Sequence, residues 1–162
     1  MGTGSASKMD FGTLLKPEAV KVVTSASSKK RLLHEIGDLV QSAYDINAAL
    51  VVEALMAREA LGPTGVGHGV ALPHARLDGI DNVMGAFVLL DKPIDFDAVD
   101  RQPVDIAFAL FAPEEAGVEH LKALALVSRT LRDQTICTKL RANPDSSTIY
   151  AILNEANPAQ AA

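Results

Sequence analysis

The chain has 162 residues, of which 48% are hydrophobic, and a formal net charge of −5 at pH 7. This length suits one domain with a substantial apolar core, and the acidic balance lacks the basic stripe of a nucleic-acid-binding protein. No apolar run approaches the roughly 20 residues that span a bilayer, so nucleic-acid binding and membrane insertion are both disfavoured.

The N-terminus and the single cysteine indicate how the protein is processed. Residues 1–8 are small and polar and precede a second methionine, Met9, so we interpret them as an expression scar and residues 9–162 as the domain. The N-terminus lacks the apolar core of a signal peptide. Cys137 is the only cysteine and has no partner for an internal disulfide. Together these features predict a cytoplasmic protein.

Two amphipathic helices are predicted first along the chain. Apolar residues recur at helical spacing from Ser28 to Tyr44, and Ser28 is a suitable N-cap. A second helix is predicted from Asn47, which can cap it, through Arg58. Gly62 followed by Pro63 then predicts a stop.

A glycine-rich segment from Gly65 to His74 comes next. Glycines at positions 65, 67 and 69 allow positive φ or a close approach, and Val70–Leu72 predict a short buried strand. Pro73 stiffens the chain, so we expect His74 to leave the sheet at the end of this strand, from a fixed direction. Such stiffness suits a nucleophile. The alternative is a tight turn that merely carries a histidine.

Strands and then helices follow. The apolar runs Val83–Leu90 and Val104–Phe111 predict strands covered on both faces, and the acidic segment Asp91–Pro103 between them predicts a loop long enough to carry function. Helical spacing then returns, and helices are predicted from Val118 to Arg132, after Asp133 and from near Ser146. This order of elements indicates a single-domain α/β sandwich with a sheet between helical layers.

Metal-binding and hydrolase chemistry have little support in the sequence. His68 and His74 are six residues apart, roughly 20 Å in an extended strand, and no Cys or HExxH pattern accompanies them. No GxSxG nucleophile elbow is present, and Cys137 falls in an amphipathic helix, where we predict a core residue. We therefore expect no metal and no cofactor.

Three further polar residues have competing interpretations. His120 lies at the edge of the apolar stripe of its helix, so it is either a packing residue or a hydrogen-bond donor near His74. Arg58 lies near the end of its helix, where a cation favours the helix dipole, but bent toward His74 it would neutralise a phosphoryl group. His34 is predicted to be solvated surface.

Several segments together carry a family resemblance: Arg58-Glu59, residues 62–67, 70–74, 94–100 and 102–105, and His120-Leu121. They resemble the type-2 EIIA domains of the bacterial phosphotransferase system, which are the fructose- and mannitol-type phosphocarriers. Residues 94–105 and 131–137 look most like the nitrogen-regulatory branch. The resemblance covers nearly everything after Leu14 and implies a central mixed β-sheet flanked by helices on both faces.

The resemblance also implies a reaction. His74 would accept a phosphoryl group at Nε2 from a histidine phosphocarrier resembling HPr, called NPr in this branch, in a relay that begins with phosphoenolpyruvate. His120 and Arg58 would line the phosphoryl site, and the adjoining loop would contain Thr64, Gly65 and Gly67. A neutral imidazole, with a pKa of about 6.5, has the lone pair that a nucleophile needs. Arginine, histidine and backbone N–H groups can stabilise the loose transition state without a metal.

Two residues depart from the family pattern, and the function has alternatives. His68 stands where relatives more often have Asn or Ser, and Pro63 replaces a common Ser; both affect the expected donor geometry. We expect a mainly regulatory phosphoprotein, and the family's regulatory partners include potassium-transport and sensor-kinase proteins. One alternative is a sugar-specific EIIA component that passes phosphate to a fructose- or mannitol-type IIB protein. Another is a binding module in which His74 is never phosphorylated.

Overall fold

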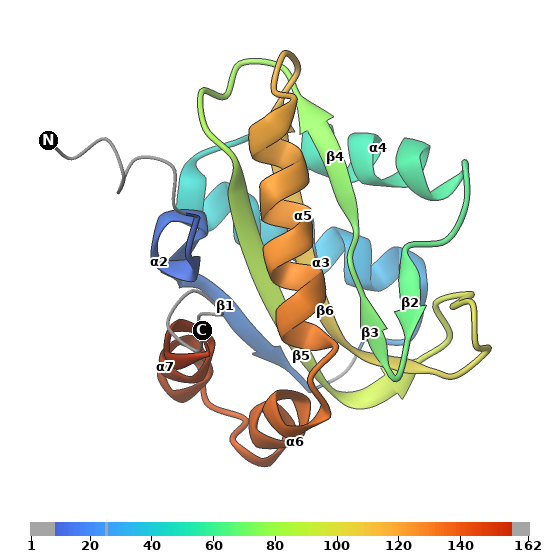
Figure 1. Cartoon of the computed structure of the whole chain (residues 1–162). Helices are drawn as coiled ribbons and strands as arrows, with labels where there is room; N and C mark the ends of the chain where they lie inside the picture. Colours follow the sequence, from blue (N-terminus) through green and yellow to red (C-terminus); the bar gives the residue numbers. More distant parts are fainter. Residues whose placement is uncertain (1–8, 25, 157–162) are drawn as a thin grey trace, which may run out of the picture.

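A mixed sheet forms the centre of the computed structural model, which describes residues 9–24 and 26–156 (Figure 1). The sheet has six strands in the order β1-β5-β6-β3-β2, and β4 also pairs with β6. Antiparallel β5 and β6 lie at its centre, and β1 pairs with β5 in parallel. The predicted α/β sandwich with a mixed sheet is therefore confirmed. The proposed expression scar, residues 1–8, lies outside the described residues.

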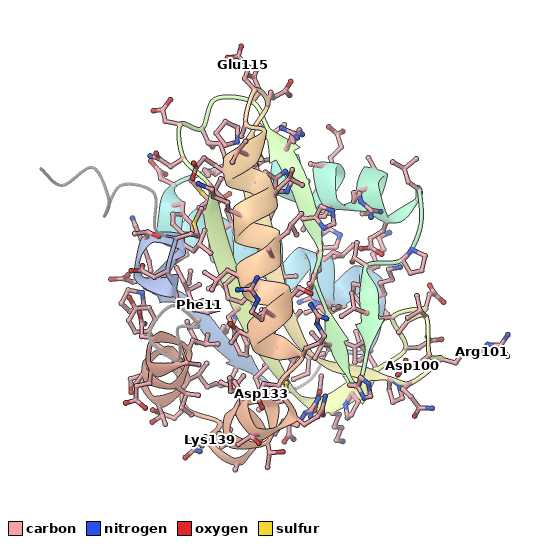
Figure 2. The ribbon with its side chains drawn as sticks, in the orientation of Figure 1. Phe11, Asp100, Arg101, Glu115, Asp133 and Lys139 are labelled. Atoms are coloured by element: carbon pink, nitrogen blue, oxygen red, sulfur yellow. The ribbon has the colours of Figure 1, made fainter. Side chains whose placement is uncertain are left out.

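The long strands are β1 (Leu15–Val23), β5 (Met84–Ile94) and β6 (Val104–Pro113). The prediction placed residues 91–94 in a loop, but β5 continues through Pro93 to Ile94, which pairs with Val104. The sequence did not predict β1, because its exposed Lys16, Pro17 and Glu18 interrupt the apolar pattern. The connecting loop is therefore residues 95–103, and Figure 2 shows Arg101 projecting from it, away from the body of the molecule.

The glycine-rich segment is not the single strand that was predicted. It forms β2 (Gly65–Gly67), a turn at His68 and Gly69, and then β3 (Val70–Ala71), which pairs with β2 in an antiparallel hairpin. His68 and Gly69 have φ of 58° and 81°, the positive values that a tight type I′ hairpin turn requires. After Pro73 the chain continues as β4 (His74–Leu77), which pairs with β6 in parallel. His74 therefore begins a strand, and the prediction that it leaves the sheet at a strand end is wrong.

Helices cover both faces of the sheet (Figure 1). The helices α3 (Lys29–Tyr44) and α4 (Ala48–Glu59) lie behind the sheet in this view, and α5 (Val118–Leu131) crosses the front. As predicted, the side chains of Ser28 and Asn47 cap α3 and α4. The remaining helices are α2 (Phe11–Leu14), α6 (Gln134–Ala142) and α7 (Ser146–Glu155). The sequence did not predict α2, which is a single turn closed by a capping box.

The core fills the space between β5, β6 and the helices. All five phenylalanines are fully buried, and Phe108 of β6 contacts both Phe11 and Phe87, with ring centroids 5.6 and 6.2 Å apart. Burial of each such side chain contributes about 1.5–3 kcal/mol. Cys137 is buried and His34 is exposed, as predicted. Among residues 9–24 and 26–156, no helix has the length and apolar character that a membrane crossing requires.

Candidate functional site

His74 is fixed in place by the backbone around it. The Pro73 carbonyl accepts a hydrogen bond from Leu110 N–H at 2.9 Å, so the pairing of β4 with β6 begins immediately before His74. The ring Nδ1 lies 2.8 Å from the Leu72 carbonyl oxygen. Because a carbonyl can only accept, Nδ1 carries the proton and Nε2 carries the lone pair. His74 is half-buried, and this hydrogen bond leaves the lone pair on Nε2.

Arg58 approaches His74 from the last turn of α4. Its Nε donates to His74 Nε2 at 3.4 Å, and its Nη1 donates to the Gly62 carbonyl at 2.9 Å. The second bond holds the guanidinium against the turn that follows α4. A guanidinium fixed beside His74 Nε2 is well placed to stabilise negative charge there. The two side chains that the sequence analysis linked are therefore in contact.

His120 lies in the first turn of α5 and is only 7% exposed. Its ring centroid is 5.7 Å from that of His74, with an interplanar angle of 71°. Burial, and to a lesser extent the nearby charges of His74 and Arg76, lower the pKa of His120 below 6.5. His120 is therefore neutral at pH 7. Within the described part of the chain, its Nε2 is buried and has no hydrogen-bond partner.

An open cavity of about 480 Å³ exposes these groups to solvent. Arg76 also lines it, and its guanidinium donates to the carbonyls of Pro113, Glu114 and Ala116. Apolar side chains complete the wall; they are Ala54, Ala57, Leu61 and Ala75. The two arginines give the cavity positive charge, which suits an anion such as a phosphoryl group. In the described residues no cluster of three or more His, Cys, Asp or Glu side chains could hold a metal ion.

Comparison with known proteins identifies the family. Residues 13–156 match the family model described as "Phosphoenolpyruvate-dependent sugar phosphotransferase system, EIIA 2". The chain belongs to this EIIA family. A nitrogen regulatory protein from Bradyrhizobium diazoefficiens is 46% identical over 145 residues, which cover 90% of this chain and 95% of the relative. A fructose-specific EIIA component from Haloferax volcanii is 32% identical over 149 residues, covering 90% and 96%.

A solved structure agrees with this assignment. The crystal structure of the nitrogen regulatory protein IIA-Ntr from Neisseria meningitidis has 37% sequence identity and a TM-score of 0.82. The match covers 88% of this chain and 98% of the solved chain. The EIIA fold that the sequence implied is therefore confirmed over most of the chain.

The predicted loop residues of this EIIA chain lie apart from the cavity. Thr64 is 4% exposed and is hydrogen-bonded to Glu59. Gly65 pairs with Ala71 in the hairpin, where a side chain would meet Ala98: an added Cβ would lie 2.8 Å from the Ala98 Cβ. Its lack of a side chain thus allows the 95–103 loop to pack closely. The structure brings together His74, Arg58 and His120, and does not place Gly65 in their cavity wall.

Gly67 and the two unusual residues also lie elsewhere. Gly67 and His68 line a separate hollow of about 240 Å³ beside the end of α5. The backbone N–H of His68 donates to Asp100, and its carbonyl accepts from Arg141 at 3.0 Å. Pro63 is exposed in the turn after α4. The departures at His68 and Pro63 therefore leave the residues that line the His74 cavity unchanged.

Sequence reasoning missed the partners of Thr64. The Glu59 carboxylate accepts hydrogen bonds from the Thr64 N–H, at 3.2 Å, and from the Thr64 hydroxyl. The Lys29 ammonium is 2.8 Å from the same carboxylate. In the sequence, Glu59 is a charged residue at a helix end, which is typical of a solvated position. Only the three-dimensional contacts distinguish Glu59 from such a solvated position.

Proposed function

We propose that His74 accepts a phosphoryl group at Nε2 from an HPr-like phosphocarrier, NPr, in a relay driven by phosphoenolpyruvate. The observation that carries this proposal is the hydrogen bond from His74 Nδ1 to the Leu72 carbonyl, because it leaves the lone pair on Nε2 facing Arg58. A neutral imidazole in this tautomer is ready to attack phosphorus without losing a proton first. The EIIA family membership supports the same reaction.

In the proposed transfer, His74 Nε2 forms a bond to phosphorus as the bond from phosphorus to the donor's imidazole nitrogen breaks. The donor imidazole leaves with that electron pair, and the His74 ring proton stays on Nδ1, where it remains hydrogen-bonded to the Leu72 carbonyl. In the unphosphorylated structure, Arg58 Nε donates to the lone pair that would attack phosphorus. During transfer this Nε must therefore donate to a phosphoryl oxygen instead, while Nη1 keeps its bond to the Gly62 carbonyl. The Nε2 of His120, which has no partner among residues 9–24 and 26–156, is the proposed neutral N–H donor to a second oxygen.

We propose a mainly regulatory role for the phosphorylated and unphosphorylated forms. The support is the 46% identity to a protein named a nitrogen regulatory protein. A phosphoryl group adds up to two negative charges to the cavity, which is enough to change binding to a partner protein. Potassium-transport and sensor-kinase proteins are the proposed classes of partner, and the cytoplasm is the proposed compartment.

The second candidate is a sugar-specific EIIA component that passes phosphate to a IIB protein of a fructose- or mannitol-type permease. The 32% identity to a protein named a fructose-specific EIIA component favours it. Incubation of the phosphorylated protein with fructose- and mannitol-type IIB proteins tests this candidate. Loss of phosphate from His74 to one of them would favour transport over regulation.

Intact-mass spectrometry tests the phosphocarrier function directly. The protein is incubated with phosphoenolpyruvate, the first enzyme of the relay and NPr. We expect one acid-labile phosphoryl group on the wild type and on His34→Ala, which alters an exposed histidine, and none on His74→Ala. No phosphate on the wild type would overturn the relay assignment and favour a binding module.

A further inference from the structure

A polar cluster surrounds Glu59, the residue that follows Arg58 of the His74 cavity. The side chain of Glu59 is only 6% exposed. Its carboxylate accepts from both the N–H and the hydroxyl of Thr64, and it pairs with the Lys29 ammonium at 2.8 Å. A buried carboxylate is costly unless it is paired and hydrogen-bonded, so these three donors form an organised unit.

One path from this cluster leads to Arg58, the residue before Glu59. The turn after α4 is closed by the Gly62 N–H, which donates to the Glu59 carbonyl at 3.1 Å, and by the anchored Thr64 at its other end. The Gly62 carbonyl in this turn accepts from Arg58 Nη1 at 2.9 Å. The position of the Arg58 guanidinium therefore depends on a turn that Glu59 holds at both ends.

A second path leads to His74 through the backbone. The Thr64 carbonyl accepts from the Leu72 N–H at 2.9 Å. The Leu72 carbonyl in turn accepts from His74 Nδ1 at 2.8 Å. Thr64 thus fixes the peptide segment that selects the tautomer of the nucleophile.

Lys29 extends the cluster to the 95–103 loop. Its ammonium is 3.6 Å from the Asp97 carboxylate and 4.7 Å from the centre of the Phe96 ring. Phe96 is fully buried, so this contact joins the base of the loop to the first turn of α3. The cluster therefore connects α3, the loop and the turn beside the site.

We propose that Glu59 is a positioning residue for phosphoryl transfer. By anchoring Thr64, its carboxylate fixes two carbonyl groups. The Gly62 carbonyl accepts a hydrogen bond from Arg58, and the Leu72 carbonyl accepts one from His74 Nδ1. Lys29 balances the charge of the carboxylate. This inference rests on the proposed phosphoryl transfer to His74. It adds a physical reason why the side chains of Arg58 and His74 keep fixed positions relative to each other.

The test compares Glu59→Gln with Glu35→Gln. Glu35 of α3 is a matched control because it pairs with Lys21 at 3.1 Å and has a side chain 14% exposed, but it has no contact that leads to His74. Two readouts are measured: the initial rate of phosphorylation by phospho-NPr, and the ¹⁵N shifts of the His74 ring in the unphosphorylated protein. These shifts distinguish an N–H nitrogen from a lone-pair nitrogen and do not respond to stability alone.

We expect Glu59→Gln to slow phosphorylation about tenfold or more, because small displacements of reacting groups are costly, and to move the His74 shifts toward a mixture of tautomers. Glu35→Gln should keep the wild-type rate and shifts. Wild-type values of both readouts in Glu59→Gln would overturn the proposal.

A second pair keeps the test valid if Glu59→Gln does not fold. Thr64→Val removes the hydroxyl that contacts Glu59 with little change in shape, and Thr64→Ser restores a hydroxyl. We expect Thr64→Val to slow the reaction and shift the His74 nitrogens, and Thr64→Ser to rescue both. Equal behaviour of Thr64→Val and wild type would contradict the proposal.

The two proposals can fail separately. If the wild type takes no phosphate from the relay, the proposed function fails. The ¹⁵N shifts still test whether Glu59 and Thr64 hold His74 in one tautomer, since that measurement needs no phosphate donor.

Discussion

At the scale of the residue, two histidines in one cavity have different environments. His74 is half-buried, and a carbonyl acceptor fixes its tautomer. His120 is buried without a partner for Nε2 among the described residues, and burial lowers its pKa. The environments therefore fix the tautomer of one imidazole, as the proposed nucleophile requires, and keep the other neutral beside it, next to two arginines that carry the positive charge.

The lowered pKa of His120 predicts how stability depends on pH. Because the folded-state pKa lies below the ordinary 6.5, the unfolded chain binds more protons than the folded chain between the two values. The contribution of neutral His120 to stability is therefore fully present above pH 6.5 and is lost as the pH falls toward the folded-state pKa. We expect the wild type to lose more stability than His120→Gln between pH 7 and about pH 5.5.

Urea unfolding of both proteins at several pH values measures this difference. The glutamine keeps a polar side chain of similar length but does not titrate, so other groups contribute equally to the two curves. Parallel curves for wild type and His120→Gln would contradict the prediction.

At the scale of the element, the β2–β3 hairpin holds the 95–103 loop against the sheet. The Val99 N–H donates to the Gly65 carbonyl at 3.3 Å, and the Asp100 carboxylate accepts from the His68 N–H at 2.9 Å. The His68 bond, with that of Gln102, lowers the pKa of Asp100. The hairpin and the loop thus share hydrogen bonds at two neighbouring positions.

Gly65→Ala should disturb this contact. The new Cβ would lie 2.8 Å from the Ala98 Cβ and 2.9 Å from its Cα, so the loop backbone must move. We expect a loss of about 1–3 kcal/mol in the free energy of unfolding, measured with urea. Gly12→Ala is the control, since its nearest neighbours are 3.4 and 3.5 Å away, and it should change stability by less than about 1 kcal/mol. Equal stabilities would show that the loop yields at no cost.

The sequence predicted most elements, and its errors have physical causes. Caps at Ser28 and Asn47 were correct because an N-cap depends on local geometry. The prediction of a single strand from Gly65 to His74 was wrong. A hairpin turn with positive φ has no reliable sequence signal when its first residue, here His68, is not Asn, Asp or Gly. Edge strand β1 was missed because its exposed residues are charged and its pairing with β5 is distant in the chain.

For the site, the sequence identified the residues that carry recognisable chemistry. His74, Arg58 and His120 were candidates by residue type and by family resemblance, and the structure places them around one cavity. The contacts that hold these three side chains could not be predicted, because Lys29 is 30 residues before Glu59 and meets the Glu59–Thr64 pair only after folding. The contacts that position the side chains of the site are therefore the part that could not be predicted from the sequence.

At the scale of the whole molecule, β6 connects the site to the C-terminal helices. Leu110 of β6 pairs with His74, and Asp105, near the start of the same strand, pairs with Arg141 of α6. Arg141 binds the Asp105 carboxylate through Nε and Nη2 at 2.9 Å, and its Nη2 also donates to the His68 carbonyl at 3.0 Å. One side chain therefore fastens α6 to both the central strand and the hairpin turn.

Arg141→Gln should loosen this junction. The glutamine cannot form the two parallel bonds to Asp105, whose side chain is 18% exposed and would lose its charged partner. Because the pair is partly solvated, we expect a loss of about 1–2 kcal/mol in the free energy of unfolding at pH 7. Lys139→Gln, at an exposed position of the same helix, should have almost no effect. Urea unfolding of the wild type and both variants measures this difference. If Arg141→Gln were as stable as Lys139→Gln, the Arg141–Asp105 pair would contribute nothing and apolar packing alone would hold α6 against the sheet.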